Sequence, residues 1–183
     1  ANNLAIRNKL HGKIKATSVL TGLLRSSQIT GGFIPVLKKN GTTEIKQVSD
    51  DKMQVLKEFM EDLPDGKKVV IFCRFLPEID AIVTMLNEME IPAASITGAT
   101  SGQARSDLID AFQETDEPRV LVIQTQTGGL GITLTRADTA IFYSYSYSFA
   151  DYEQARARIH RIGQTNKVTY IHLVARNTVD EAV

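Results

Sequence analysis

Apolar positions in the later two-thirds of the chain alternate between the spacing of strands and the spacing of helices. Short apolar runs predict strands at 68–73, 93–96, 119–124, 139–143 and 168–174. Apolar residues three and four apart predict helices over 77–89, 101–114 and the arginine-rich stretch 154–164. Strands that alternate with helices form βαβ units, so we expect an α/β fold with a doubly wound, mainly parallel sheet flanked by helices.

The first fifty residues follow a different pattern. Residues 4–27 are typical of helix, although Gly12 and Gly22 make two short helices as consistent with the pattern as one. Apolar runs at 33–37 and 44–48 flank Asn40-Gly41, the turn dipeptide of a hairpin. Ser49 is then a predicted helix cap, followed by an amphipathic helix to about residue 63. We therefore divide the chain into a helical and hairpin extension, 1–50, and an α/β lobe, 51–183.

Composition limits the classes of protein that remain. With 183 residues and 43% hydrophobic residues, the chain can bury one core but not two of ordinary size. The single cysteine, Cys73, lies in an apolar strand, which excludes an internal disulfide framework and fits a reducing compartment. There is no apolar run of membrane-spanning length, and the three histidines are not clustered as metal ligands are. We expect no membrane partner and no metal bound by this chain alone.

The net charge of zero hides an uneven distribution. Residues 1–43 carry seven basic and no acidic residues, whereas the remainder carries 14 basic and 21 acidic residues. A front segment of charge +7 could be directed to a polyanion such as nucleic acid. A solvated basic surface without a partner explains the same charge equally well.

Residues 154–164 hold the densest group of candidate chemical side chains. Gln154, Arg158 and Arg161 are spaced i, i+4 and i+7, which would place them on one face of a helix. Guanidinium groups held on a rigid helix suit phosphate oxygens, because they are planar, permanently charged and bidentate. A solvated, arginine-rich helix end is the alternative for this stretch taken alone.

A glycine-rich loop, 127–135, follows the predicted strand 119–124. Glycines at 128, 129 and 131 permit close approach of the backbone to a phosphate or ribose, although a tight turn needs the same residues. The chain contains no G-x-x-x-x-G-K-[ST] sequence and no acidic Walker B strand. It therefore lacks the usual means of holding the β and γ phosphates and magnesium.

Together, the glycine loop and the arginine stretch resemble motifs five and six of the superfamily-two helicases. The ending H-R-I-G-Q, 160–164, is typical of the Swi/Snf-type DNA translocases. The predicted strand and its polar end at 69–75 resemble motif four. The loop 98–101, with Arg105 and Phe112, resembles the family's G-x-T-S, Arg and Phe series. The last segment, 167–181, resembles the strand and helix start that close the lobe. The resemblance runs from about Lys67 to Val183 and implies the second RecA-like lobe of such an enzyme.

This resemblance implies a division of labour with another lobe. ATP and Mg²⁺ would be held mainly by an N-terminal RecA-like lobe that is not in this sequence, and double-stranded DNA would be the track. The implied catalytic residues are the arginine fingers Arg158 and Arg161, with Gln154 beside them. The implied nucleotide contacts are Gly129, Gly131 and Thr133. The implied nucleic-acid contacts are Arg74, Gly98, Ser101, Arg105, Thr125, Gln126 and Thr127. For Arg105, a salt bridge that holds the following loop is an equal alternative.

Two departures from the family pattern indicate a subgroup. Where many eukaryotic members have an aspartate and a Trp-Asn-Pro element, this chain has tyrosines and serines at 143–148. The tyrosine-serine form resembles bacterial and phage members, so we expect a cytoplasmic protein, or a nuclear one if the source is eukaryotic. Thr133 stands where an asparagine is common, and its hydroxyl can still form a hydrogen bond, so this departure bears on one contact only. A start without methionine and an end inside a helix start lead us to expect a lobe excised from a larger protein. Because the phosphate cradle and the metal ligands are absent, we expect no ATPase activity from this lobe alone. A non-catalytic nucleotide- or nucleic-acid-binding module and an RNA helicase lobe are the alternatives, and the I-G-Q ending disfavours the latter.

Overall fold

The computed structural model describes residues 19–127 and 131–182. Its first elements are helix α2 (Val19–Thr30) and strands β1 (Phe33–Leu37) and β2 (Thr43–Gln47). The helices of the lobe are α3 (Asp51–Glu61), α4 (Leu76–Glu88), α5 (Gly102–Glu114) and α6 (Phe149–Ala157), with 3₁₀ turns η1 (Thr125–Thr127) and η2 (Val179–Ala182). Its strands are β3 (Val69–Cys73), β4 (Ala93–Ile96), β5 (Val120–Gln124), β6 (Thr139–Phe142) and β7 (Thr169–His172).

The five strands of the lobe form one parallel sheet in the order β4-β5-β3-β6-β7. Val69 of β3 pairs with Val120 of β5 on one side and with Thr139 of β6 on the other. The central strand is buried along its whole length, which explains its continuous run of apolar residues. The predicted fold class is confirmed.

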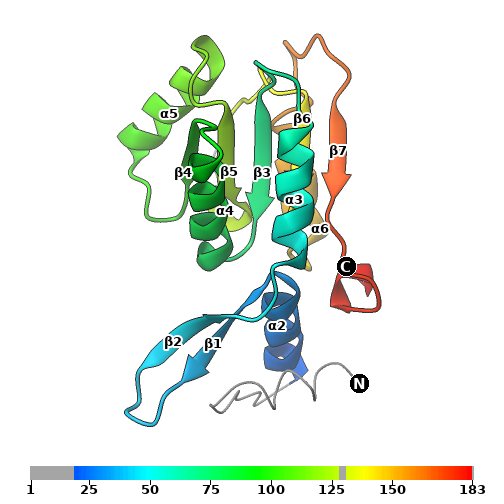
Figure 1. Ribbon diagram of the computed structural model, residues 1–183. Helices are drawn as coiled ribbons and strands as arrows, with labels where there is room; N and C mark the ends of the chain where they lie inside the picture. Colours follow the sequence, from blue (N-terminus) through cyan, green and yellow to red (C-terminus); the bar gives the residue numbers. More distant parts are fainter. Residues whose placement is uncertain (1–18, 128–130, 183) are drawn as a thin grey trace.

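Two layers of helices cover the sheet, and the alternation of side chains along β3 divides the core between them. Ile71 and Cys73 face the cluster under α3 and α4, while Val70 and Phe72 face the cluster that includes residues of α5 and α6. Figure 1 shows α3 and α4 in front of the sheet, with α6 behind it. Helices on both faces of a parallel sheet are the arrangement expected for a doubly wound lobe.

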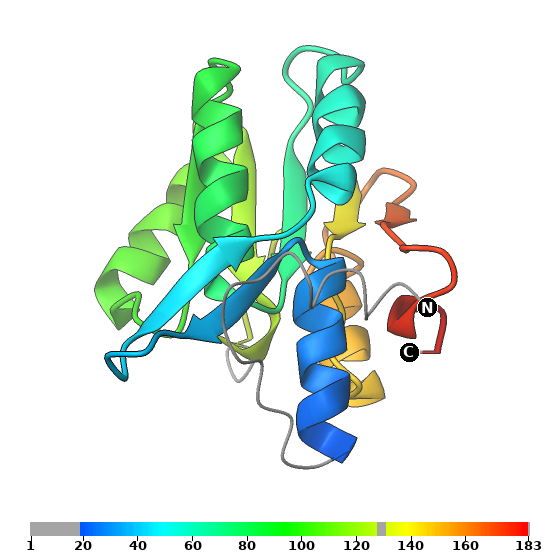
Figure 2. The same ribbon diagram turned by 60° about the horizontal axis from the view of Figure 1, so that its bottom comes forward.

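The described part of the extension, residues 19–47, lies below the carboxyl ends of the strands, as Figures 1 and 2 show. Its helix α2 runs through Gly22 without a break, and β1 and β2 form the predicted antiparallel hairpin. The expected break at Gly12 falls in 1–18, outside the described residues. Ser49 lies one residue before the N-cap position of α3, which is Asp50, but its hydroxyl still accepts a hydrogen bond from the backbone N–H of Asp51 at 3.2 Å.

The arginine helix is shorter than predicted, and this changes the geometry of its side chains. Helix α6 ends at Ala157, with Arg158 as its C-cap, and the chain then turns. The backbone N–H of Leu134 donates to the carbonyl of Arg158 at 2.8 Å. The end of the glycine-rich loop therefore contacts the backbone at the point where the helix stops. The expectation that Gln154, Arg158 and Arg161 share one helix face is therefore wrong.

Candidate nucleotide and nucleic-acid interface

The carboxyl edge of the sheet brings several predicted site residues together. Connections leave the central strands on opposite faces at this edge: α4 follows β3 on one face, and the segment after β5 joins the face of α5 and α6. Open α/β sheets bind ligands at such a switch point. Arg74 follows β3 here, and Gln126 follows β5; both line a cavity of about 290 Å³ between the edge and the hairpin.

Arg161 lies exposed against the glycine loop. Its Nη1 donates to the carbonyl oxygen of Gly131 at 3.2 Å and to the hydroxyl of Thr133 at 3.1 Å. These contacts orient the guanidinium and leave further N–H groups for another acceptor. The structure therefore brings Arg161 together with Gly131 and Thr133, two of the predicted nucleotide contacts. The third, Gly129, lies outside the described residues.

Arg158 occupies a different environment from Arg161. It is 4% exposed, and its buried Nη1 has no hydrogen-bond partner in the part of the chain that the structure describes. Burial lowers the pKa of the guanidinium, although the group stays charged because arginine begins from a very high value. Gln154 is exposed on α6, so the three predicted catalytic residues do not form one surface.

Gln164, the last residue of H-R-I-G-Q, fixes the turn that carries the arginines. Its amide nitrogen donates to the carbonyls of Ala137 at 2.7 Å, Thr135 at 3.1 Å and Ile159 at 3.4 Å. One side chain thus joins the end of the glycine loop to the turn after α6. Because Ala137 precedes β6, this junction lies toward the amino edge of the sheet rather than at the carboxyl edge, where we had expected the whole glycine loop.

Arg74 is held by aromatic rings beside the carboxyl edge. Its guanidinium carbon lies 5.1 Å from the ring centre of Phe75 and 5.5 Å from that of Tyr147, and Nη1 donates to the carbonyl of Tyr145 at 3.5 Å. The side chain is half-buried, so its charge remains available to solvent on one side. Such a stacked arginine is suited to phosphate contact.

The loop after β4 forms a second group with helix-capping geometry. Ser101 caps α5, and its hydroxyl accepts the backbone N–H of Ala104 at 3.3 Å. Gly98 donates its backbone N–H to the side chain of Gln124 at 3.0 Å. Arg105 donates to the carbonyl of Thr100 at 3.0 Å, so it holds the preceding loop by a hydrogen bond rather than the following one by a salt bridge.

The three residues of η1 have separate roles. Thr125 is 5% exposed, and its hydroxyl donates to the carbonyl of Cys73 at 2.8 Å, so its side chain serves the junction of β3 and β5 and cannot face a ligand. The hydroxyl of Thr127 donates to the carbonyl of Gln124 at 2.6 Å. Gln126 is exposed and is the member of this group whose side chain is free to meet nucleic acid.

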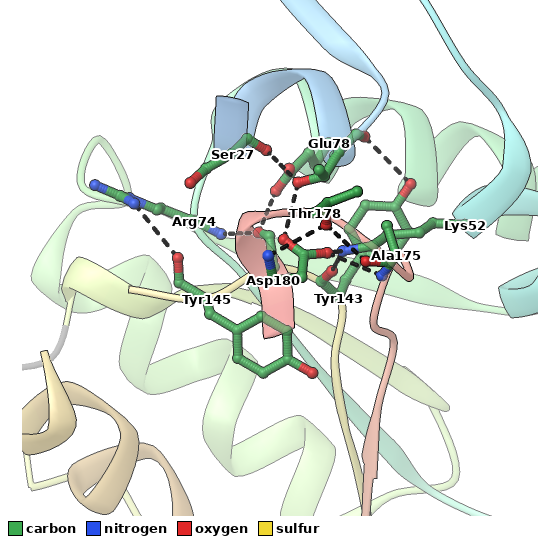
Figure 3. Close-up of polar contacts among 12 residues, drawn as sticks. Ser27, Lys52, Arg74, Glu78, Tyr143, Tyr145, Ala175, Thr178 and Asp180 are labelled. Atoms are coloured by element: carbon green, nitrogen blue, oxygen red, sulfur yellow. Dashed lines mark hydrogen bonds and ion pairs between the residues drawn. The ribbon is translucent and has the colours of Figure 1, made fainter. Parts of the chain in front are cut away.

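A buried polar network behind the carboxyl edge was not predicted from the sequence (Figure 3). Lys52 of α3 pairs with Asp180 of η2 at 2.5 Å and donates to the carbonyl of Tyr143 at 3.0 Å. Glu78 of α4 accepts a hydrogen bond from the hydroxyl of Ser144 at 2.5 Å. The available sequence signal was weak, because lysine and glutamate at helix starts are ordinarily solvent-exposed.

Two further searches cover the described residues only. Among them, no helix has the length and apolar character needed to span a membrane. Within the same residues, no group of three or more His, Cys, Asp or Glu side chains is arranged to hold a metal ion.

Comparison with known proteins identifies the family. The model of the helicase conserved C-terminal domain matches residues 51–163. The ATP-dependent helicase fft2 of Schizosaccharomyces pombe is 31% identical over 150 residues, which are 81% of this chain and 12% of the relative. The chromatin-remodeling ATPase INO80 of Saccharomyces cerevisiae is 33% identical over 160 residues, which are 83% of this chain and 11% of the relative. The solved C-terminal part of the Fun30 ATPase domain superposes with a TM-score of 0.67 at 28% identity, covering 74% of this chain and 46% of that structure.

These relatives also bear on the expected subgroup. They come from yeasts, so the comparison does not support the bacterial or phage-like variant suggested by the tyrosines and serines at 143–148. The chain spans only about a tenth of the length of the curated relatives it matches, 12% and 11%.

The family model covers more than half of the chain, and the solved relative shares its RecA-like sheet. The chain therefore belongs to the helicase conserved C-terminal domain family and is homologous to the Swi/Snf-type ATPases of superfamily two.

Proposed function

We propose that this chain is the second lobe of an ATP-dependent translocase on double-stranded DNA, and that Arg161 is its principal arginine finger. The observation that carries the proposal is the exposed guanidinium of Arg161, oriented by Gly131 and Thr133. A positioned guanidinium stabilises the charge that spreads over the transferred phosphoryl oxygens. The nucleotide and Mg²⁺ would be held by an N-terminal RecA-like lobe, since this chain has no Walker A sequence.

Arg158 is proposed as a second arginine that acts from a buried position. Its Nη1 is a buried donor that none of the described residues satisfies. An anionic phosphate oxygen brought by a closing first lobe is the type of acceptor that such a donor fits. Gln154 remains in the proposal as an exposed neighbour on α6, and Gly129, Gly131 and Thr133 remain the proposed nucleotide contacts.

The proposed DNA track follows the carboxyl edge. It comprises Arg74, Gly98, Ser101, Arg105, Gln126 and Thr127. Backbone amides, hydroxyls and arginines of this kind contact phosphate and sugar rather than base edges, which suits a motor that moves along any sequence. The side chain of Thr125 is removed from the predicted set because it is buried.

Arg74 provides a test of this track. Replacing it with alanine is expected to weaken duplex binding equally for unrelated sequences. It should also reduce the slope of log affinity against log salt by about 1, because the loss of one phosphate contact means that fewer counterions are released on binding. Binding would be measured by fluorescence anisotropy across a salt series. Lys57→Ala, which removes an exposed charge on α3, is the matched control and should leave the slope unchanged. An unchanged slope for Arg74→Ala would place Arg74 off the DNA.

The names of the relatives bear on the location of the protein, and binding and turnover assays distinguish the alternative functions. One relative is named a chromatin-remodeling ATPase, and chromatin is nuclear, so we favour a nuclear location over the cytoplasmic one. An RNA helicase lobe would bind duplex RNA in preference to duplex DNA. A non-catalytic binding module would bind but would not support ATP turnover when joined to a first lobe.

A further inference from the structure

The carboxyl group of Glu78 joins the ends of two neighbouring strands. Glu78 is 1% exposed, in the first turn of α4. Its Oε2 accepts hydrogen bonds from the backbone N–H of Phe75 at 3.2 Å and from the hydroxyl of Ser144 at 2.5 Å. That hydroxyl also accepts the backbone N–H of Arg74 at 2.7 Å, and the contacts can be followed in Figure 3. Through Ser144, one carboxyl therefore sets the positions of the residues that follow β3 and β6.

The other oxygen of Glu78 faces the junction between α2 and β1. Oε1 is buried and has no hydrogen-bond partner among the described residues. A Cβ atom at Gly31 would lie only 1.8 Å from Oε1, so a residue without a side chain lets the junction close directly on the carboxyl. The carbonyl oxygen of Ser27 is 3.4 Å from the position of that Cβ atom and already accepts hydrogen bonds from the backbone N–H of Gly31 at 3.1 Å and the hydroxyl of Thr30 at 2.9 Å.

The charged and titratable groups around Glu78 come from the surrounding elements. Lys52 of α3 lowers the pKa of Glu78, but the ammonium of Lys52 is already paired with Asp180 of η2. Burial raises the pKa of the Cys73 thiol on β3 and of the Tyr143 phenol just after β6, so both are neutral near pH 7. From the side of α2, the groups at this point are the backbone of Ser27 and of Gly31, which follows the helix.

We propose that Glu78 is a proton-operated latch that ties the α2–β1 junction to the carboxyl ends of β3 and β6. In the protonated form, the proton resides on Oε1 and removes the buried charge that faces the junction, while Oε2 continues to accept from Ser144 and Phe75. In the ionised form, an unpaired charge faces the junction, and the cost of burying it loosens the contact. The hydrogen bond from the backbone N–H of Arg74 to Ser144 connects Arg74 to the latch. The latch itself does not depend on the proposed function; only an effect of the latch on DNA binding through Arg74 does.

The sign of the pH dependence follows from burial. Burial raises the pKa of Glu78 to about 7, against the opposing hydrogen bonds from Ser144 and Phe75 and the charge of Lys52. The folded-state value lies above that of an unfolded glutamate, so the contribution of the closed latch is complete at acidic pH and is lost as pH rises through about 7. The latch would thus operate across the physiological range.

The test combines two measurements on the 183-residue chain. Carbon NMR of the Glu78 carboxyl should give a titration midpoint near 7. Amide hydrogen exchange, corrected for the intrinsic effect of pH, should show protection of residues 23–31 falling by about five- to tenfold across the same midpoint relative to β3, as expected when a buried unpaired charge favours local opening. A midpoint below about 5, or protection that does not change through the titration, would overturn the latch.

Three variants separate a latch from a merely structural carboxyl. Glu78→Gln retains an acceptor for Ser144 and carries no charge at any pH, so protection should stay high at every pH. Ser144→Ala removes a hydrogen bond that lowers the pKa of Glu78, so the midpoint should move upward. Asp80→Asn changes an exposed carboxyl on the same helix and should preserve the wild-type profile. A pH step in Glu78→Gln equal to that of the wild type, or an unmoved midpoint in Ser144→Ala, would contradict the proposal.

Discussion

Replacing Arg161 with alanine in the complete enzyme is expected to lower DNA-stimulated ATP turnover by about 10³- to 10⁵-fold, the usual cost of losing an arginine finger. The fold should remain intact, because Arg161 is exposed and its side-chain contacts are two hydrogen bonds to the glycine loop. A loss of 10³-fold corresponds to about 4 kcal/mol of transition-state stabilisation. Steady-state turnover with saturating duplex DNA measures the effect, and thermal unfolding checks the fold.

Two further variants test whether the loss of turnover is specific to the proposed arginine fingers. Arg176→Ala removes an exposed arginine between β7 and η2 and should leave turnover unchanged. Arg158→Ala should lower turnover and also destabilise the lobe, because the buried stem of this arginine packs inside the protein. Near-normal turnover in Arg161→Ala would show that Arg161 is not the finger.

Replacing Asp180 with alanine is expected to reduce the free energy of unfolding by about 3–5 kcal/mol, because Lys52 would be left buried without its counter-charge. Lys52 and Asp180 have side-chain exposures of only 8% and 6%. Asp180 also accepts hydrogen bonds from the hydroxyl of Thr30 at 2.9 Å and from the backbone N–H of Ala175 at 3.1 Å. Urea unfolding at pH 7 measures the loss.

An exposed ion pair in the same chain supplies the control. Lys38 and Glu44 lie 3.2 Å apart at side-chain exposures of 48% and 42%, so Glu44→Ala should cost at most about 1 kcal/mol. In the double variant Lys52→Met with Asp180→Ala, part of the stability should return, because no unpaired charge remains buried. If Asp180→Ala costs no more than Glu44→Ala, the buried pair does not anchor η2 to α3.

The elements that were predictable are those set by local periodicity. The strand expected at 93–96 has those bounds, and the hairpin turns at Asn40-Gly41 as its dipeptide indicates. Continuous apolar runs of four to six residues between helical patterns suffice to predict buried parallel strands. The contact between Arg161 and the glycine loop was not predicted, because the resemblance implied only that both would meet the nucleotide.

The features that were not predictable depend on residues far apart in sequence. The sequence pattern predicts one helix over 154–164, but the helix ends at Ala157, where the backbone of Arg158 contacts the end of the glycine-rich loop. The turn that follows leaves Arg158 buried and Arg161 exposed. Glu78 resembles an exposed residue of a first helical turn, yet it is buried against Ser144, 66 positions away. Such pairings have no period in the sequence, so local patterns cannot reveal them.

ATP turnover by the purified chain, alone and joined to a first lobe with a Walker A sequence, tests the central claim most directly. We expect the chain alone to stay at the no-enzyme background with and without duplex DNA, because it lacks a phosphate cradle. The joined protein should hydrolyse ATP when duplex DNA is present, and the Arg161→Ala form of it should not. DNA-stimulated turnover by the chain alone would contradict the account of this lobe as half of an ATPase.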